Sequence, residues 1–395
     1  MQTMQKNRDG TLKGYTILQV LPRLDVGGVE RGCVDMAQAI VSCGGRAIVA
    51  SQGGQLVSVL KNKNIDHVTL PLASKNPFQM GINHYRLKRL IRDRQIDVVH
   101  ARSRAPAWSA YWACIHSDKP FMTTFHSIYP FTNRLQKIYN TVMSLGERVI
   151  AISYFVADHI RTHYPHAADR IRVVQRGIDL SYFQPFTLSS ARLMKMRQQY
   201  DLSSDRLLIL VPGRLSHRKG QFDFLYALAC LDHPNVHCLM VGPNGTTGRF
   251  RRKVQMLADK LGLSKCVSIY GSCDDMPALY ALADVVVVPS KYEGFGRVAV
   301  EAQAMGRPVI CHATSGLNEV VHDQHTGWLV SPENPVALAR CLDYVLRMTP
   351  EERSALSSRA RAWVEKHFTT EQMTSATIDV YAELLAARTS TDRLS

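Results

Sequence analysis

The chain has 395 residues, too many for a single hydrophobic core and a natural length for two domains. Its 46% hydrophobic and 21% charged residues are ordinary for a globular protein, and no low-complexity or repeated segment occurs. The apolar runs are strand-sized, well below the roughly 20 residues of a membrane-spanning helix. The formal net charge of +15 implies an anionic partner, which is nucleic acid, a phosphate-bearing substrate or an acidic lipid surface.

Short apolar, β-branched runs alternate with helical patterns along the chain, which predicts parallel sheets with helical crossovers. The pattern lapses over residues 179–205, which we interpret as an interdomain linker that contains a polar helix. Two long helices are expected at the end, over residues 350–366 and 370–387. In the first half the strands are expected at 16–21, 46–51, 67–72, 97–101, 121–125, 149–153 and 171–174, and in the second half at 207–212, 236–241, 267–269, 285–288, 309–311 and 327–330.

The fold class predicted by this order is α/β, with two doubly wound parallel-sheet domains. We expect the first domain over residues 15–182 and the second over 205–367, with a final helix at 370–388 that packs back on the first domain. Two such domains in tandem are expected to face each other across a cleft, with the ligand at the carboxyl ends of the strands.

Two general features bear on the compartment. The nine cysteines are scattered without metal-like spacing, which favours reduced core thiols in a cytosolic protein. The first 16 residues have no apolar core and are not expected to be a secretory signal.

The segment 85–94 predicts a basic helix with an apolar stripe at Leu87, Leu90 and Ile91. One interpretation is a surface helix that packs this stripe on its own sheet, and another is a contact with anionic lipid headgroups. Both can hold on opposite faces of one helix. No nucleic-acid motif accompanies the charge, and aromatic residues are not interleaved with it, so nucleic-acid binding is not expected.

Four loops directly follow predicted strands and therefore fall on the carboxyl rim of a sheet. In the loop 24–31, Gly27 and Gly28 allow the backbone to approach an anion at a helix start. The spacing is not that of a dinucleotide fold, and a tight turn alone would also explain the glycines. In the loop 123–127, His126 is suited to hydrogen bonding or proton transfer near a sugar, although a structural histidine is an open alternative.

The third loop, 212–220, is densely cationic after a buried strand. Arg214 and Lys219 supply a donor fork and a point charge, which a diphosphate requires. A salt-bridged surface turn is the alternative. The spacing is not that of a P-loop.

The segment 289–310 carries the most information. Glu293 and Glu301 are separated by seven residues, and Gly294, Phe295 and Gly296 form a turn before a helix expected to begin near Gly296. A strand, a glycine turn and a helix offer backbone N–H groups to a phosphate. Phosphate would repel the two carboxylates, so they make more sense as acceptors for sugar hydroxyls, and the unit suggests a ligand such as a nucleotide sugar. No Asp-x-Asp pair occurs in the chain, so we expect no metal clamp.

In their order and spacing these segments resemble the retaining GT-B glycosyltransferases of family 4, which include bacterial lipopolysaccharide, capsule and mannosyl transferases. The resemblance covers nearly the whole chain. Arg176-Gly177 departs from the commoner Asn-Gly, and Cys311-His312 after the Pro-Val strand also departs, which leaves details of the donor open. The segments that carry the resemblance are Gly27 to Glu30, Thr124 to His126, Ala151 to Ser153, Arg176 to Asp179, Gly213 to Leu215, Lys219-Gly220, Leu239 to Gly242, Pro289-Ser290, Glu293 to Gly296, Glu301-Ala302, Gly306 to Val309, Gly316, Glu319 and Thr326 to Val330.

The resemblance implies a cytoplasmic, metal-independent, retaining transferase that needs no cofactor beyond a UDP- or GDP-linked sugar donor. It implies that Glu293 contacts the sugar, Glu301 the ribose, and Arg214 and Lys219 the diphosphate. The acceptor is expected to be a lipopolysaccharide core or another lipid-linked glycan, bound by the first domain at the inner face of the membrane. Also implied are His126 near the reacting sugar face, Gly28 over the diphosphate, and donor contacts at Gly27, Gly213, Gly294, Phe295, Gly296, Arg297 and Val298.

Two classes of rival function remain open, which are a GT-B enzyme of another kind and a non-catalytic anion-binding protein. A GT-B nucleotide-sugar epimerase would convert donor without an acceptor, and a sugar phosphorylase would usually carry a pyridoxal-phosphate lysine in a longer chain. A non-catalytic anion-binding protein would explain the charge but not the two glutamates beside a glycine turn.

Overall fold

The computed structural model describes residues 10–25, 27–233, 235–243 and 248–392. The chain divides into two compact units, of which unit 1 is Met1–Gln175 with Glu371–Ser395 and unit 2 is Arg176–Thr370. Val26, in the first predicted glycine loop, lies outside the described residues.

Unit 1 is built on a seven-stranded parallel sheet with the order β3-β2-β1-β4-β5-β6-β7. Its central strands are almost wholly buried, which explains their mainly apolar sequences. The order reverses direction after β1, so the chain folds as a doubly wound sheet. The strands are β1 Thr16–Val20, β2 Arg46–Ser51, β3 Asp66–Thr69, β4 Val98–Ala101, β5 Phe121–Phe125, β6 Arg148–Ala151 and β7 Ile171–Val173.

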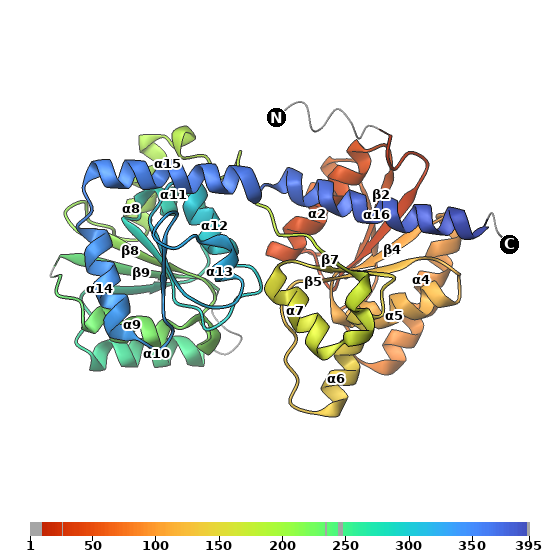
Figure 1. The fold of residues 1–395 in the computed structure, drawn as a ribbon, viewed down its shortest axis with the longest axis horizontal. Helices are drawn as coiled ribbons and strands as arrows, with labels where there is room; N and C mark the ends of the chain where they lie inside the picture. Colours follow the sequence, from red (N-terminus) through yellow and green to blue (C-terminus); the bar gives the residue numbers. More distant parts are fainter. Residues whose placement is uncertain (1–9, 26, 234, 244–247, 393–395) are drawn as a thin grey trace. The chain divides into compact units, whose positions relative to one another are not determined.

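Helices cover both faces of this sheet. In Figure 1, α2 and α16 lie above β4, β5 and β7, and α5 and α6 lie below them. Residues of α2, α3 and α16 share one hydrophobic core with β1, β2 and β4, so α16 is an integral part of unit 1. The helices are α2 Gly28–Ser42, α3 Val57–Asn62, α4 Pro77–Asp93, α5 Arg104–Ile115, α6 Arg134–Thr141, α7 Tyr154–His163 and α16 Thr370–Asp392, with short 3-10 turns at η1 Val142–Ser144 and η2 Pro165–Arg170.

Unit 2 repeats the plan with a six-stranded parallel sheet of order β10-β9-β8-β11-β12-β13. The reversal of order falls between β8 and β11, so the loops that follow these two strands meet at the carboxyl edge of the sheet. The strands are β8 Leu207–Pro212, β9 Val236–Val241, β10 Val267–Tyr270, β11 Val285–Val288, β12 Val309–His312 and β13 Trp328–Val330.

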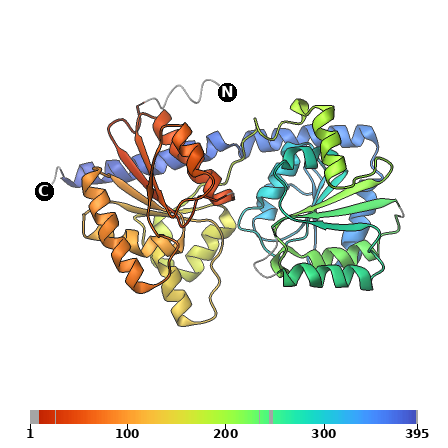
Figure 2. The same ribbon diagram turned by 180° about the vertical axis from the view of Figure 1, so that it is seen from behind.

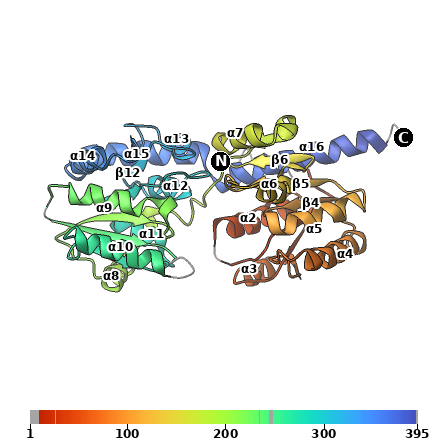
Figure 3. The same cartoon turned by 90° about the horizontal axis from the view of Figure 1, so that it is seen from below.

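The helices of unit 2 also lie on two faces, which is visible from behind in Figure 2. Residues of α9, α10 and α14 form one core with the sheet, and α9 and α10 lie side by side in Figure 3. The helices are α8 Ser190–Gln199, α9 Gln221–Ala229, α10 Arg249–Lys260, α11 Met276–Leu282, α12 Arg297–Ala304, α13 Leu317–Val320, α14 Pro335–Leu346 and α15 Pro350–His367, with 3-10 turns at η3 Pro185–Thr187 and η4 His217–Lys219.

The structure confirms the predicted fold class of two doubly wound parallel-sheet domains. The linker interpretation of residues 179–205 is wrong, because this segment packs on unit 2. Arg192 of α8 makes a two-pronged ion pair with Asp275, with both N–O distances 2.6 Å. Asp275 also caps α11 by accepting the N–H of Ala278 at 3.2 Å. The polar composition that suggested a linker therefore belongs to a docked helix.

None of the helices in the described part of the chain is long and apolar enough to cross a membrane. All nine cysteines are free thiols in the structure.

Candidate functional site

Two loops at the carboxyl edge of the second sheet are locked together by a glycine. Gly220, with a φ of +68°, ends the loop that follows β8. A Cβ atom at this position would lie 1.7 Å from the carbonyl oxygen of Pro289, which follows β11. Only glycine allows this approach, and the approach brings the side chain of Lys219 to the segment that contains Glu293.

Lys219 and Glu293 form an ion pair between Nζ and Oε1. Their side chains are only 14% and 12% exposed, so the pair is mostly buried. Ser290 Oγ donates a second hydrogen bond to Glu293 Oε1 at 2.8 Å, and the backbone N–H of Glu293 donates to Ser315 Oγ at 2.8 Å. The carboxylate is thus held in one orientation at the carboxyl edge of the sheet.

The glycine turn ends at the start of α12, as the sequence predicts. Gly296 has a φ of +99° and precedes the first helical residue, Arg297. A Cβ atom at Gly296 would lie 2.8 Å from Leu317 Cδ2, so the turn also packs against α13. Among the described residues, the backbone N–H groups of Arg297 and Val298 have no acceptor, as is usual for the first turn of a helix. These amides are available to an anionic ligand.

Phe295 is buried and packs edge-on against Phe368, with ring centroids 5.6 Å apart. Gly294 is buried beside it. These two predicted site residues are therefore buried within the turn, and they contribute to its conformation.

Glu301 lies one turn further along α12 and is only 7% exposed. Arg297 Nε donates to its Oε1 at 2.7 Å, and the hydroxyl of Tyr280 donates to its Oε2 at 2.9 Å. Burial, followed by the negative charge of Glu301, raises the pKa of Tyr280 well above its ordinary value, so the hydroxyl stays protonated and donates. Sequence reasoning did not find Tyr280, which sits in the middle of an apolar helix where no motif marks it.

Arg214 stands on the loop after β8 with its side chain exposed. Among the described residues its guanidinium has neither a hydrogen bond nor an ion pair, whereas its carbonyl accepts Gln221 Nε2 at 3.1 Å. The backbone of the loop is therefore fixed while the positive charge remains uncompensated. Gly213 has a φ of +138°, and a Cβ atom at this position would lie 3.6–3.7 Å from the side chain of Lys219.

In unit 1, the predicted glycine loop leads into α2. Gly27 precedes the helix in an extended conformation, and Gly28 is the first helical residue. A Cβ atom at Gly27 would lie 2.3 Å from Oε2 of Glu30, so the Glu30 carboxylate sits over the start of α2. A second anion at this end would have to displace that carboxylate.

His126 directly follows β5 and is half-buried. Thr124, just before it, is buried and its Oγ1 lies 2.7 Å from His100 Nε2. The other ring nitrogen of His100 lies 2.7 Å from the hydroxyl of Tyr381 on α16. Burial, followed by the positive charge of Arg102, holds the pKa of His100 well below its ordinary value. Sequence reasoning missed this buried chain of polar groups, since its members are far apart in the sequence.

The structure thus gathers the predicted residues of unit 2 at one edge of its sheet. Lys219 meets Glu293, and Arg297 meets Glu301. In unit 1, Gly27, Gly28 and His126 follow the carboxyl ends of β1 and β5.

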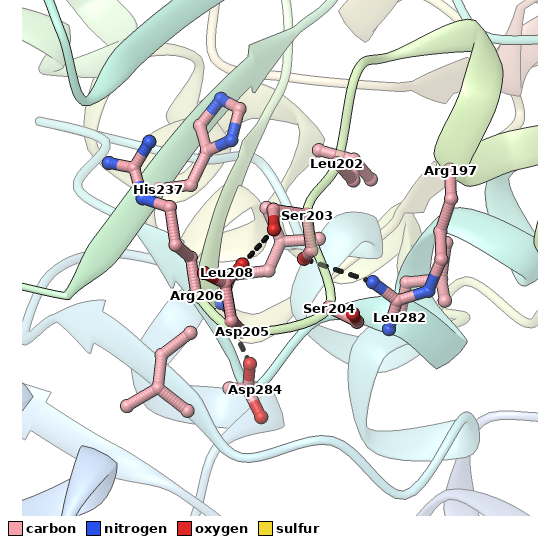
Figure 4. Close-up of a pocket in the computed structure, with 11 residues that line it drawn as sticks. Arg197, Leu202, Ser203, Ser204, Asp205, Arg206, Leu208, His237, Leu282 and Asp284 are labelled. Carbon is pink, nitrogen blue, oxygen red and sulfur yellow. Dashed lines mark hydrogen bonds between the residues drawn. The ribbon is translucent and has the colours of Figure 1, made fainter.

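A small hollow of about 160 Å³ opens at the opposite end of the second sheet, where β8 and β11 begin (Figure 4). Its polar groups bond one another, since the N–H of Leu208 donates to Asp284 Oδ2 at 2.7 Å and Arg197 Nη1 donates to the carbonyl of Ser203 at 3.1 Å. Ligands of doubly wound sheets bind at the carboxyl ends of the strands, so we assign the site to the Lys219–Glu293 edge.

Two family models match the chain in succession. The model described as Glycosyltransferase Family 4 matches residues 26–182, and the model described as Glycosyl transferases group 1 matches residues 194–363. Together they span both units.

Relatives and solved structures agree with these models. A D-inositol 3-phosphate glycosyltransferase of Xylanimonas cellulosilytica is 31% identical over 309 residues, which are 74% of this chain and 73% of the relative. That of Salinispora tropica is 33% identical over 258 residues, 62% of this chain and 52% of the relative. The match spans only about half the length of several such relatives.

A crystal structure of a glycosyltransferase from Rickettsia africae is 36% identical, covers 94% of this chain and 98% of its own, and has a TM-score of 0.86. The Anabaena protein Alr3699/HepE in complex with UDP-glucose is 22% identical, with a TM-score of 0.79 over 93% of this chain and 99% of its own, which shows a shared fold.

The two sheets and their helices define a GT-B protein. The chain belongs to the group 1 and family 4 glycosyltransferases.

Proposed function

We propose that this protein is a retaining glycosyltransferase that transfers a hexose-type sugar from a nucleotide diphosphate sugar to a saccharide acceptor. The observation that carries the proposal is the Lys219–Glu293 pair, held beside the start of α12 with Arg214 uncompensated on the same edge. Cations and open amides suit a diphosphate, and a fixed carboxylate suits sugar hydroxyls.

In this proposal Arg214 and Lys219 bind the diphosphate with help from the amides of Arg297 and Val298. Glu293 accepts hydrogen bonds from the sugar hydroxyls, and its bond to Ser290 keeps it oriented. Glu301 binds the ribose. Its carboxylate already accepts hydrogen bonds from Arg297 and Tyr280, so the ribose hydroxyls must share these oxygens.

The proposed reaction is a front-side displacement. The acceptor oxygen forms a bond to the anomeric carbon as the bond from that carbon to the diphosphate breaks. The departing phosphate oxygen takes the acceptor proton, so no protein nucleophile is needed and the anomeric configuration is retained. Arg214 and Lys219 stabilise the charge that develops on the diphosphate. We place His126 near the reacting face of the sugar.

We propose that the reaction needs no metal, because two cationic side chains are available to neutralise the leaving group and the sequence has no Asp-x-Asp clamp. Transfer that persists after dialysis against EDTA supports this point. A loss that Mg²⁺ or Mn²⁺ restores contradicts it.

The acceptor is proposed to be a lipopolysaccharide core or another lipid-linked glycan. Relatives named for D-inositol 3-phosphate make a phosphorylated polyol a second candidate. Transfer assays with each class of acceptor separate the two.

We also propose that unit 1 contacts the anionic inner face of the membrane. It contains 25 lysines and arginines against 15 aspartates and glutamates, so +10 of the charge falls in this unit. Lys88, Arg89 and Arg92 of α4 line an open cavity of about 910 Å³ at the amino-terminal end of the first sheet. Tyr85, 72% exposed, stands beside these cations, as suits an interfacial aromatic anchor.

A panel of UDP- and GDP-linked sugars tests the donor assignment. We expect one or a few of them to bind in calorimetry and to raise the melting temperature, and the Anabaena neighbour makes UDP-glucose a reasonable first choice. Conversion of the donor without acceptor would indicate an epimerase, and phosphate-dependent breakdown of a glycan a phosphorylase. Binding of none of the panel overturns the proposal.

A further inference from the structure

Most arginines of unit 1 that the structure describes are neutralised by carboxylates. Pairs of this kind join Arg23 to Asp25, Arg46 and Arg94 to Asp66, Arg89 and Arg92 to Asp93, Arg148 and Arg172 to Glu383, Arg161 to Asp158, and Arg388 to Asp118 and Glu147. Six described arginines of this unit have no such pair, and two of them, Arg102 and Arg104, follow the carboxyl end of β4 and are at least half-buried.

Arg102 directly follows β4 and is only 5% exposed. Its Nη1 donates to Gln19 Oε1 at 3.0 Å, and its Nε is buried without a hydrogen-bond partner. Gln19 is itself fixed, because its Nε2 donates to the carbonyl of Cys33 at 3.1 Å. The guanidinium is therefore held by a neutral group, and no carboxylate in the described part of the chain compensates its charge.

Arg104 is the first residue of α5 and is half-buried. Its Nη1 donates to Asn140 Oδ1 at 2.7 Å, and its guanidinium lies over the ring of Tyr129, 4.4 Å from the centroid. Stacking and one neutral hydrogen bond fix the direction of the side chain. Among the residues that the structure describes, no carboxylate pairs with it.

Two such cations only two residues apart in the sequence are costly. A buried guanidinium loses hydration, and without a counter-charge the loss is not offset within the protein. Both guanidinium groups are nevertheless held in place by neutral partners. This arrangement leaves guanidinium N–H donors that a bound anion can use. Because Arg is suited to two-pronged contacts with phosphate and carboxylate, the ligand class is an oxyanion.

The position of Arg104 connects this anion to the predicted reaction. Tyr129, which carries the stacked guanidinium, packs against Phe125 with ring centroids 5.0 Å apart. Phe125 is the last residue of β5, and His126 follows it. Arg104 therefore lies beside the segment expected to face the acceptor, at the same edge of the first sheet.

We propose that Arg104, with Arg102 behind it, binds a phosphate or carboxylate group of the acceptor, so that the enzyme selects anionic saccharides. The proposal rests on the proposed transferase function and specifies its acceptor. Arg104 is a specificity-determining residue in this account, and unit 2 retains the donor site.

The first test is binding of inorganic phosphate to the full chain, measured by calorimetry. The background is Arg214→Gln, which removes a donor-side cation. We expect Arg104→Gln to weaken phosphate binding about tenfold or more, because it removes charge-assisted hydrogen bonds. The matched control is Arg161→Gln, which removes an exposed arginine of the same unit that Asp158 already neutralises, and it should leave the affinity unchanged.

Equal phosphate affinity in the Arg104→Gln and Arg161→Gln proteins overturns the inference. If Arg104→Gln lowers the melting temperature, Arg104→Lys decides, since it keeps the positive charge but loses the two-pronged contact, and it should bind phosphate more tightly than Arg104→Gln does. Failure of Arg104→Lys to do so also overturns the inference.

The second test is kinetic. In the otherwise wild-type chain, Arg104→Gln should raise the KM for a phosphorylated or carboxylated acceptor, leave the KM for its neutral analogue unchanged, and leave the Kd for the donor sugar unchanged. An equal rise for both acceptors contradicts the inference. If the wild-type chain binds no nucleotide sugar, the transferase proposal fails, while the phosphate titration still decides whether Arg104 binds an oxyanion.

Discussion

Lys219 and Glu293, which are 74 residues apart in the sequence, form a mostly buried ion pair at the carboxyl edge of the second sheet. A pair so far from bulk water is costly to maintain, because both charges lose hydration. Ser290 supplies one compensating hydrogen bond to the carboxylate. In our account the bound nucleotide sugar offsets the rest of the lost hydration, since its diphosphate contacts the lysine and its sugar hydroxyls contact the glutamate.

The glycine that joins the two loops gives the first prediction. Gly220→Ala should lower the free energy of unfolding and weaken nucleotide-sugar binding, because the new methyl group would meet the Pro289 carbonyl and displace Lys219. Gly262→Ala is the matched control, since its φ of +73° is similar and a Cβ atom there meets nothing within 4 Å. It should cost only about 1 kcal/mol. Chemical denaturation measures both, and equal effects would show that the contact with Pro289 is unimportant.

The second prediction concerns Tyr280. Tyr280→Phe removes the hydroxyl that donates to Glu301 and leaves one buried carboxylate oxygen without its donor. We expect a loss of about 1–3 kcal/mol in the free energy of unfolding and weaker nucleotide binding. Tyr344→Phe, at a tyrosine that is 55% exposed, should change neither. Unaltered nucleotide affinity in Tyr280→Phe would contradict the claim that Tyr280 orients Glu301 for nucleotide binding.

The third prediction follows from the histidines of unit 1. Burial, followed by the positive charge of His163, lowers the pKa of His159 from 6.5 to about 4, and its Nε2 accepts the N–H of Tyr129 at 3.4 Å. The unfolded chain therefore takes up the proton first as the pH falls. The contribution is fully present above pH 6.5 and is lost as the pH falls toward 4, so the free energy of unfolding should decrease over this range. His100 acts in the same direction.

Denaturation at pH 7.5 and pH 5 measures the effect. His159→Gln retains an acceptor for the N–H of Tyr129 but does not titrate, so it should reduce the difference between the two pH values. An unchanged difference would show that His159 does not carry the dependence.

The fourth prediction concerns the basic face of α4. The triple variant Lys88→Glu, Arg89→Glu and Arg92→Glu should abolish flotation with vesicles that contain anionic phosphatidylglycerol, because it reverses three charges beside the cavity. A matched triple variant, with the same change in net charge, replaces the exposed residues Lys61, Lys63 and Lys75 by glutamate. Equal loss in both would indicate a diffuse charge effect, and no flotation of the wild-type chain at low salt would contradict membrane contact.

Much of the fold is predictable from local sequence. Parallel strands buried on both faces require apolar, β-branched runs such as Val285–Val288, and the glycine turn before α12 has a clear signature. The prediction of a linker was wrong because a long-range contact fixes the segment. The polar helix α8 is fixed by the ion pair between Arg192 and Asp275, whose partners are 83 residues apart, so composition alone cannot separate it from a linker.

The candidate site was predictable only in part. Lys219 and Glu293 lie in loops after strands, where a doubly wound sheet places ligands, and their types suit the expected chemistry. Tyr280 and Ser315 reach the two glutamates from other elements, and nothing in the neighbouring sequence marks these contacts. The unpaired state of Arg102 depends likewise on which carboxylates the fold brings near.

The central claim is that Lys219 and Glu293 form the donor site. The most direct test measures donor affinity and transfer rate in matched variants. Lys219→Met and Glu293→Gln should each lower transfer by about 10²-fold or more, whereas Lys265→Met, at an exposed lysine of the same unit, should transfer at the wild-type rate. Circular dichroism checks that each variant is folded. Folded Lys219→Met and Glu293→Gln proteins that transfer sugar as fast as the wild type would contradict the account.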